Sequence, residues 1–321
     1  MLIAQGPLRI SLFGGGSDLP AFLRHNDGAV LSMAIDRRVY IAGHPFTHRD
    51  GILLKYSQTE DVQRAQDLQH PIAREVLGRY NVNDVDLAVM ADVPAGTGLG
   101  SSSAFTVAFL ALVRRMTGLT STPVDLAREA CEIEIDVLRE PIGYQDQWAS
   151  ALGGINVLRF SASDVQVERA AVGASTIDAL EENIHLVAIG SPRRARSVLA
   201  DQESAITSGS VEEGLTRRLV EMVDQGYRAL AENIDDLGPL LAEAWELKKA
   251  IAPQASNSHI DELYWRGLDN GATGGKLLGA GGGGYLAFYV PRKQHERFTQ
   301  SMSKALDFHI SEHGAGVIHE S

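Results

Sequence analysis

The chain has 321 residues, of which 44% are hydrophobic, so it can bury a sizeable core, and its length suggests two domains. Its 41 acidic and 29 basic residues give a formal net charge of -12, which disfavours nucleic acid and anionic membrane as partners. Cys131 is the only cysteine, which excludes an internal disulfide and a cysteine-based metal cage.

The first residues lack the basic-then-apolar order of a signal peptide. The longest strongly apolar run, residues 104–113, is too short to span a bilayer. We therefore expect a cytoplasmic globular protein without a membrane or nucleic-acid partner. Nothing in the sequence predicts its oligomeric state.

Short strands dominate the first 92 residues, where β-branched residues cluster between Gly, Asn and Asp breaks. We expect these strands at 29–36, 38–44, 52–57 and 84–93, with one helix at 67–80. Two more helices are expected at 104–118 and 120–138. The last of them opens with Thr122 as N-cap, Pro123 at the first helical position and Asp125 completing a capping box.

The rest of the chain is richer in long helical patterns. Strands are predicted at 153–161, 185–190 and 285–290, and helices at 210–233 and 237–252. Residues 161–183 are predicted to be a polar connecting region. Because strands and helices mix without regular βαβ alternation, we predict an α+β fold. A boundary near residue 180 would divide the chain into domains at 1–180 and 181–321.

A cluster of glycines and serines, "GTGLGSSSAF", stands directly before the helix expected at 104–118. Glycine lets a backbone approach a ligand closely, and the first residues of a helix present amide hydrogens that have no partner within the helix. Together they predict a site for nucleotide phosphates, where a serine hydroxyl could ligate Mg²⁺. The alternative is a flexible turn with a serine N-cap, which requires neither so many small residues nor three hydroxyls. The candidate residues are Gly96, Gly98, Gly100, Ser101, Ser102 and Ser103.

Two further glycine-rich stretches lie at either end of the chain. The first, "PLRISLFGGGSDLP", leaves an expected strand and suits a loop that holds a polyol, although Asp18 could equally cap the turn before Pro20. The other, "GAGGGG" at 279–284, matches G-x-G-x-x-G, but a strand follows it where a dinucleotide site needs a helix. We predict a tight loop packed against a backbone or a ligand. The candidate substrate-binding residues here are Gly14, Gly15, Gly16, Ser17, Asp18, Gly281 and Gly282.

In the helix expected at 120–138, one carboxylate lies on the face that is expected to be turned toward the protein interior. Glu134 lies three residues after Cys131 and four after Ala130 on the apolar face, whereas Glu132 falls on the solvated side. A buried carboxylate must be paired, protonated or bound to a metal. Glu134 is therefore the candidate Mg²⁺ ligand, the alternative being a side chain that reaches water from the margin of the apolar stripe.

Two other charged residues have weaker local signals. Asp146, in "GYQDQW", could activate a hydroxyl, although it also fits an ordinary loop or helix-start aspartate. Arg193, in "SPRRARS", follows an expected strand and is either part of a solvated basic turn or an anchor for a phosphate.

Taken in order, "PLRISLFGGGSDLP", "PAGTGLGSSSAF" and "KLLGAGGGGYLAF" resemble the three motifs of the GHMP kinases, the superfamily of galactokinase, homoserine kinase, mevalonate kinase and phosphomevalonate kinase. The resemblance extends from Pro7 to about Val290. Within the superfamily the wording is most similar to bacterial D-glycero-D-manno-heptose 7-phosphate kinases, and L-fucokinase domains share much of it. The resemblance implies a ribosomal-protein-S5-like N-terminal domain and a ferredoxin-like C-terminal domain, with ATP and sugar in the cleft between them.

The same resemblance implies residue roles. Asp146 matches the catalytic base, and Arg9 matches the basic residue that supports it. Ser102 matches the Mg²⁺-binding serine, with Ser101 and Ser103 as alternatives, and Glu134 matches the Mg²⁺ glutamate.

Asp18 matches the sugar-binding aspartate of galactokinase, and Arg193 aligns with an arginine of heptokinase-like sequences that could hold a sugar phosphate. Gly15 and Gly16 depart from the galactokinase pattern, which argues against galactose.

The implied reaction is direct phosphoryl transfer from ATP, with Mg²⁺, to the anomeric hydroxyl of D-glycero-D-manno-heptose 7-phosphate, a small-molecule sugar phosphate, giving the 1,7-bisphosphate. Three alternatives stay open. The chain could be a kinase for an unphosphorylated sugar such as L-fucose, a non-catalytic nucleotide- or sugar-binding protein, or a mevalonate-branch decarboxylase that uses ATP on a non-sugar acid.

Overall fold

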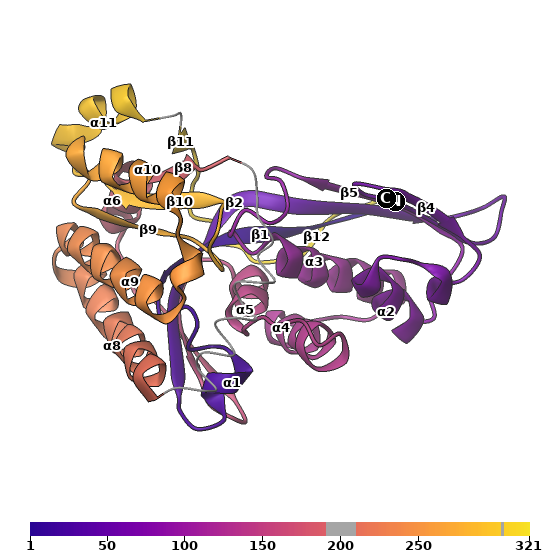
Figure 1. Ribbon diagram of the computed structural model, residues 1–321. Helices are drawn as coiled ribbons and strands as arrows, with labels where there is room; N and C mark the ends of the chain where they lie inside the picture. Colours follow the sequence, from indigo (N-terminus) through magenta and orange to yellow (C-terminus); the bar gives the residue numbers. More distant parts are fainter. Residues whose placement is uncertain (191–209, 303–304) are drawn as a thin grey trace.

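The computed structural model describes residues 1–190, 210–302 and 305–321 (Figure 1). Within these ranges, eight strands form one sheet in the order β12-β1-β2-β5-β3-β4, with β6 beside β2 and β7 beside β6. All pairs are antiparallel except β3 with β5. The strands are β1 (Leu2–Phe13), β2 (Gly28–Pro45), β3 (Ile52–Lys55), β4 (Thr59–Val62), β5 (Val85–Ala91), β6 (Ile155–Phe160), β7 (Val165–Arg169) and β12 (Gly316–Glu320).

A smaller antiparallel sheet, ordered β11-β8-β10-β9, accounts for the other four strands in the described ranges. Its members are β8 (Ile184–Ala188), β9 (Gly274–Leu277), β10 (Tyr285–Tyr289) and β11 (Ala305–Leu306). The two sheets lie toward opposite ends of the molecule in Figure 1.

The helices divide between the sheets. Those of the first half, α2 to α5, lie along one face of the larger sheet, and α9 packs on the smaller sheet (Figure 1). Helix α8 packs against α9 and also contacts β1 and β2, so it joins the two halves. The bounds are α1 (Pro20–Leu23), α2 (Pro71–Arg79), α3 (Ser101–Met116), α4 (Pro123–Cys131), α5 (Gln145–Leu152), α6 (Ala174–Asn183), α8 (Ser210–Glu232), α9 (Leu237–Ile251), α10 (Ser258–Asp269) and α11 (His295–Ser301).

The mixed, mostly antiparallel architecture confirms the predicted α+β class. A continuous apolar core links the halves, because Leu8 and Leu12 of β1 belong to the same buried cluster as Leu219 of α8 and Leu241 of α9. No helix in the described parts of the chain is both long and apolar enough to cross a membrane.

Some element predictions were wrong in informative ways. The strands expected at 29–36 and 38–44 are one strand, β2, because β1 pairs along it from Leu31 to Gly43; on its other side the first half pairs with β6 and the second half with β5. The connecting region expected at 161–183 contains β7 and α6. Strand β7 is a short, mostly exposed edge strand, and its alternation is limited to Val165 and Val167 within a polar stretch.

The C-terminal strand β12 also escaped sequence reasoning. It pairs with β1, and the amino group of Met1 donates to the carbonyl of Ser321 at 2.9 Å. The domain division at residue 180 stays a prediction. Strand β12 lies in the second expected domain by sequence and in the larger sheet by pairing.

Candidate active site

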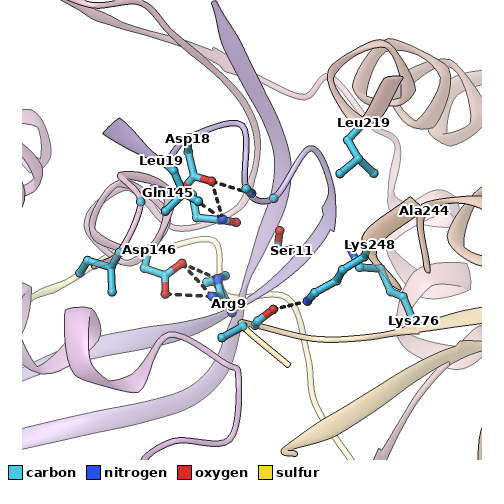
Figure 2. Close-up of a pocket in the computed structure, with 16 residues that line it drawn as sticks. Arg9, Ser11, Asp18, Leu19, Gln145, Asp146, Leu219, Ala244, Lys248 and Lys276 are labelled. Carbon is cyan, nitrogen blue, oxygen red and sulfur yellow. Dashed lines mark hydrogen bonds and ion pairs between the residues drawn. The ribbon is translucent and has the colours of Figure 1, made fainter. Parts of the chain in front are cut away.

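A partly buried ion pair joins Arg9 of β1 to Asp146 in the first turn of α5 (Figure 2). The guanidinium donates from Nε to Oδ1 and from Nη2 to Oδ2, both at 2.8 Å. Its Nη1 donates to the carbonyl of Gly98 at 2.6 Å. The Arg9 side chain is 5% exposed and that of Asp146 is 23% exposed. The two guanidinium donors therefore hold a carboxylate that is still accessible to solvent.

Two cavities meet at this pair. The first, which we name the lysine cavity, is lined by the motif around Gly15 and Asp18 and by Lys248 and Lys276. The second, which we name the serine cavity, is lined by Gly96, Gly98 and Gly100, by Ser101 to Ser103 and by Glu134. Both cavities are lined in part by Arg9, Ile142, Asp146, Gly279 and Ala280. The predicted phosphate loop, the predicted metal ligand and the predicted base therefore line one cavity.

The serine cavity has the geometry of an anion site. Gly96, Gly98 and Gly100 all have φ between 76° and 81°, in the left-handed region that favours glycine. Helix α3 begins at Ser101, and its first backbone bond runs from the amide of Ala104 to the carbonyl of Gly100. The amides of the three serines therefore precede the helical ladder and are available to an anion.

Two of the glycine-rich stretches touch through their backbones. A Cβ on Gly98 would lie 2.5 Å from the carbonyl oxygen of Leu278, and one on Gly279 would lie 2.4 Å from the Cα of Gly98. The prediction of a tight loop packed against another backbone is correct for Gly279. Gly279 also lines the serine cavity, together with Ser101 to Ser103.

Glu134 is 1% exposed, which confirms the prediction that it faces inward, whereas the Glu132 side chain is 54% exposed and pairs with Arg79. The Glu134 carboxylate accepts from Thr106 Oγ1 at 2.9 Å and from Gln147 Nε2 at 2.7 Å. Burial raises the pKa of Glu134 to about 7. The Ser103 side chain lies near enough to lower the pKa of Glu134, which opposes the effect of burial.

The backbone that carries Glu134 departs from the predicted regular helix. The stretch Glu132–Val137 is a π-helical turn, with the amide of Leu138 donating to the carbonyl of Ile133. Such turns are frequent at functional sites because they redirect side chains. Here the turn follows α4 directly.

The donor set fits Mg²⁺, which prefers oxygen ligands. Glu134 supplies a carboxylate that accepts hydrogen bonds from the neutral side chains of Thr106 and Gln147, and the serine hydroxyls line the same cavity. The described residues contain no cluster of three or more His, Cys, Asp or Glu that could hold a metal. Such a small protein donor set is typical of Mg²⁺ bound jointly by protein and nucleotide phosphates.

The first glycine-rich stretch contributes to the lysine cavity through Gly15, Gly16 and Asp18. The Asp18 carboxylate is 1% exposed and accepts from the amides of Gly16 at 2.9 Å and of Gln145 at 3.1 Å. Burial is the main cause that raises the pKa of Asp18. Asp18 therefore ties the loop to the start of α5, the helix that carries Asp146.

Four predicted residues lie away from the cavities. Ser17 is fully buried and its hydroxyl donates to the carbonyls of Gly14 and Ala29, so Ser17 and Gly14 shape the turn. Gly281 and Gly282 pack on Ala255, with the amide of Gly282 donating to its carbonyl at 2.9 Å. Arg193 falls outside the residues that the structure describes.

Sequence reasoning missed the two lysines of the lysine cavity. Lys276 in β9 is 6% exposed and donates to the carbonyl of Leu12 at 2.9 Å. Lys248 in α9 donates to the carbonyls of Leu277 and Gly279. The signal was present in α9, since Lys248 lies four residues after the buried Ala244 and three after the buried Trp245.

Comparisons with known proteins agree with this geometry. The family models described as GHMP kinases N terminal domain and GHMP kinases C terminal match residues 67–154 and 227–307. The D-glycero-alpha-D-manno-heptose 7-phosphate kinase of Campylobacter jejuni is 28% identical, over 91% of this chain and 90% of that protein. The bifunctional fucokinase/GDP-fucose pyrophosphorylase of Arabidopsis thaliana is 26% identical, and the match covers 95% of this chain but 31% of that longer protein.

Solved structures show the same fold. The crystal structure of a D-glycero-D-manno-heptose 1-phosphate kinase from "Bacteriodes thetaiotaomicron" superposes with a TM-score of 0.81 over 100% of both chains, at 21% identity. The two family matches together cover more than half of the sequence. The chain belongs to the GHMP kinases, which transfer a phosphoryl group from ATP to an alcohol acceptor.

Proposed function

We propose that this kinase phosphorylates the anomeric hydroxyl of D-glycero-D-manno-heptose 7-phosphate. The observation that carries the proposal is the Arg9–Asp146 pair, which stands where the serine cavity and the lysine cavity meet. A carboxylate at that junction is within reach of both a phosphoryl donor on one side and a hydroxyl acceptor on the other. Phosphoryl transfer needs positioning and charge stabilisation, and no covalent intermediate with the enzyme.

In this proposal the serine cavity binds the phosphates of ATP. The glycine-loop backbone and the amides of Ser101 to Ser103 donate to phosphate oxygens at the positive end of α3. Glu134 and the hydroxyl of Ser102 or Ser103 would hold Mg²⁺, which when bound offsets the charge that develops on the phosphates. Ser102 is exposed and Ser103 lies near Glu134, and both line the serine cavity, so both serines are candidates.

Asp146 accepts or orients the proton of the sugar hydroxyl. Arg9 positions the Asp146 carboxylate through its two parallel hydrogen bonds and reaches back to the phosphate loop through Gly98. One residue thus fixes the distance between base and phosphate loop. Asp18 contributes by anchoring the sugar-side loop to α5, and Gly15 and Gly16 leave room for the sugar ring.

The choice of heptose 7-phosphate draws on the motif sequences and on the similarity to the D-glycero-alpha-D-manno-heptose 7-phosphate kinase of Campylobacter jejuni. Its experiment is a comparison of kcat/KM for heptose 7-phosphate, mannose and L-fucose by coupled ADP release. We expect heptose 7-phosphate to be used far more efficiently than either free sugar. L-fucose as the best acceptor would replace the heptose assignment, and no ADP release with any sugar would overturn the sugar-kinase assignment itself.

A further inference from the structure

The lysine cavity has walls of opposite charge. Asp18 and Asp146 lie on one side, and Lys248 and Lys276 lie across from them on elements of the second half of the chain (Figure 2). The two carboxylates are already satisfied, Asp146 by Arg9 and Asp18 by backbone amides and the side chain of Gln145. The negative wall therefore does not neutralise the positive one.

Among the described residues, the two lysines have no acidic partner. Within the described ranges, neither forms an ion pair, and each ammonium donates only to main-chain carbonyls. A buried charge is costly unless paired. Burial lowers the pKa of Lys276 to about 7, with Arg9 adding to the effect, and lowers that of Lys248 well below its ordinary range.

A third polar group, a serine hydroxyl, lines the same cavity. Ser11 lines the lysine cavity and is 5% exposed, and its hydroxyl makes no hydrogen bond to any residue that the structure describes. Ser11 lies two residues after Arg9 in β1, so both side chains point to the same face of the strand. Figure 2 shows the Ser11 hydroxyl between the two charged walls. A buried hydroxyl without a partner, between a base and two cations, is a place for a polar ligand.

We propose that Lys248 and Lys276 bind an anionic group of the acceptor, and that this group is a phosphate ester. The inference rests on the proposed function. It assigns the selectivity for a phosphorylated acceptor to two lysines in the second half of the chain. A phosphate ester brings nearly two negative charges and three acceptor oxygens, which matches two neighbouring ammonium groups. The serine cavity is lined by neither lysine, which assigns them to the acceptor and not to ATP.

The charge balance gives the proposal a readout besides turnover. The groups that face Lys276 are Arg9 of β1, which raises the cost of its charge, and Lys248 of α9. Asp146 and Asp18 lie on the opposite wall and are held by their own partners. A bound dianion would favour the protonated lysine, so binding of a sugar phosphate at pH 8 should take up a proton. A free sugar should not.

The variants are Lys276→Gln, whose amide can still donate to the carbonyl of Leu12, and Lys248→Gln. Lys249→Gln is the matched control, because Lys249 is adjacent on α9 but pairs with Glu246 at 2.8 Å outside the cavity. The probes are mannose 6-phosphate, mannose and mevalonate, studied by titration calorimetry in two buffers of different ionisation enthalpy, with kcat/KM measured for each and for ATP.

We expect each cavity variant to lower the preference for mannose 6-phosphate over mannose by about 10- to 100-fold, as the loss of one charge-assisted contact predicts. The proton uptake on binding should fall as well, and Lys249→Gln should behave as wild type. The inference is overturned if the lysine variants impair ATP use more than acceptor use, or if wild type uses both sugars equally well. A stronger lysine dependence for mevalonate would show that the anion is a carboxylate.

These outcomes separate the inference from the proposed function. Wild type that phosphorylates sugars without regard to their charge keeps the sugar-kinase assignment and removes the role of the lysines. Wild type that phosphorylates no sugar, but binds mannose 6-phosphate through the lysines with proton uptake, removes the assignment and keeps the anion site.

Discussion

Replacing Asp146 by asparagine tests the centre of the proposed site. The carboxylate accepts two parallel hydrogen bonds from Arg9, and asparagine offers one oxygen and an amino group that faces another donor. One charge-assisted bond is lost, which costs about 1.5 to 3 kcal/mol of stability. Loss of the base costs a further factor of about 10² to 10⁴ in kcat, or roughly 2.7 to 5.5 kcal/mol in the barrier.

The assay therefore has three readouts: kcat by coupled ADP release, ATP affinity by titration calorimetry, and the free energy of unfolding in urea. We expect a large fall in kcat, a moderate fall in stability and nearly unchanged ATP affinity. Asp61→Asn is the matched control. Asp61 pairs with Arg49 in the same two-bond manner, but its side chain is 53% exposed and lies outside both cavities.

The control should retain wild-type kcat and lose less than about 1 kcal/mol, as surface ion pairs do. Two results would refute the reasoning for Asp146. One is a folded Asp146→Asn protein with kcat within about threefold of wild type, far below the expected contribution of a base. The other is a loss of ATP affinity that accounts for the whole loss of activity, which would make the pair a support for the phosphate loop alone.

Three further predictions concern the serine cavity. Glu134→Gln should raise the Mg²⁺ concentration needed for half-maximal activity more than Glu132→Gln does, and the reverse order would remove Glu134 as the metal ligand. Without Mg²⁺, the raised pKa of Glu134, about 7 against an ordinary 4.5, means that the folded protein binds this proton more tightly than the unfolded chain. The free energy of unfolding should therefore fall as the pH rises from about 4.5 to 7, by at most about 1.4 kcal/mol per pH unit. Urea unfolding of Glu134→Gln should lack this pH-dependent part of the stability. Finally, Gly98→Ala should destabilise the protein and weaken ATP binding, because its Cβ would lie 2.5 Å from the carbonyl of Leu278. Gly118→Ala has a similar φ of 78° and nothing within 4 Å, so it should show the strain without the collision, and calorimetry of both variants with ATP should separate the two effects.

Local patterns predicted the parts of the site that are local. Three glycines and three serines at a helix start indicate an anion site because the geometry is set by neighbours in sequence, and the structure places them in one cavity. The inward position of Glu134 followed from the helical period. Glu134 faces inward although it lies inside the π-helical turn Glu132–Val137, because α4 is regular up to Cys131 and Glu134 is only the third residue of the turn.

Contacts between distant segments were beyond local patterns. Arg9 and Asp146 are separated by 137 positions, and only the resemblance to a known family related them. The pairing of β12 with β1 is of the same kind. Lys248 was missed for a different reason. Its spacing from Ala244 and Trp245 indicates an inward-facing side chain, as the spacing of Glu134 did. However, the pair Lys248 and Lys249 at the end of a helix is also typical of an exposed basic turn.

The most direct measurement of the central claim is the structure of the product. Heptose 7-phosphate incubated with the enzyme, ATP and Mg²⁺ would be followed by phosphorus NMR with correlation to the sugar protons. We predict a new phosphate resonance coupled to the anomeric proton, with one ADP formed per bisphosphate. Phosphorylation at any other hydroxyl, or ATP consumption without a new sugar phosphate, would contradict the assignment of Asp146 to the anomeric hydroxyl.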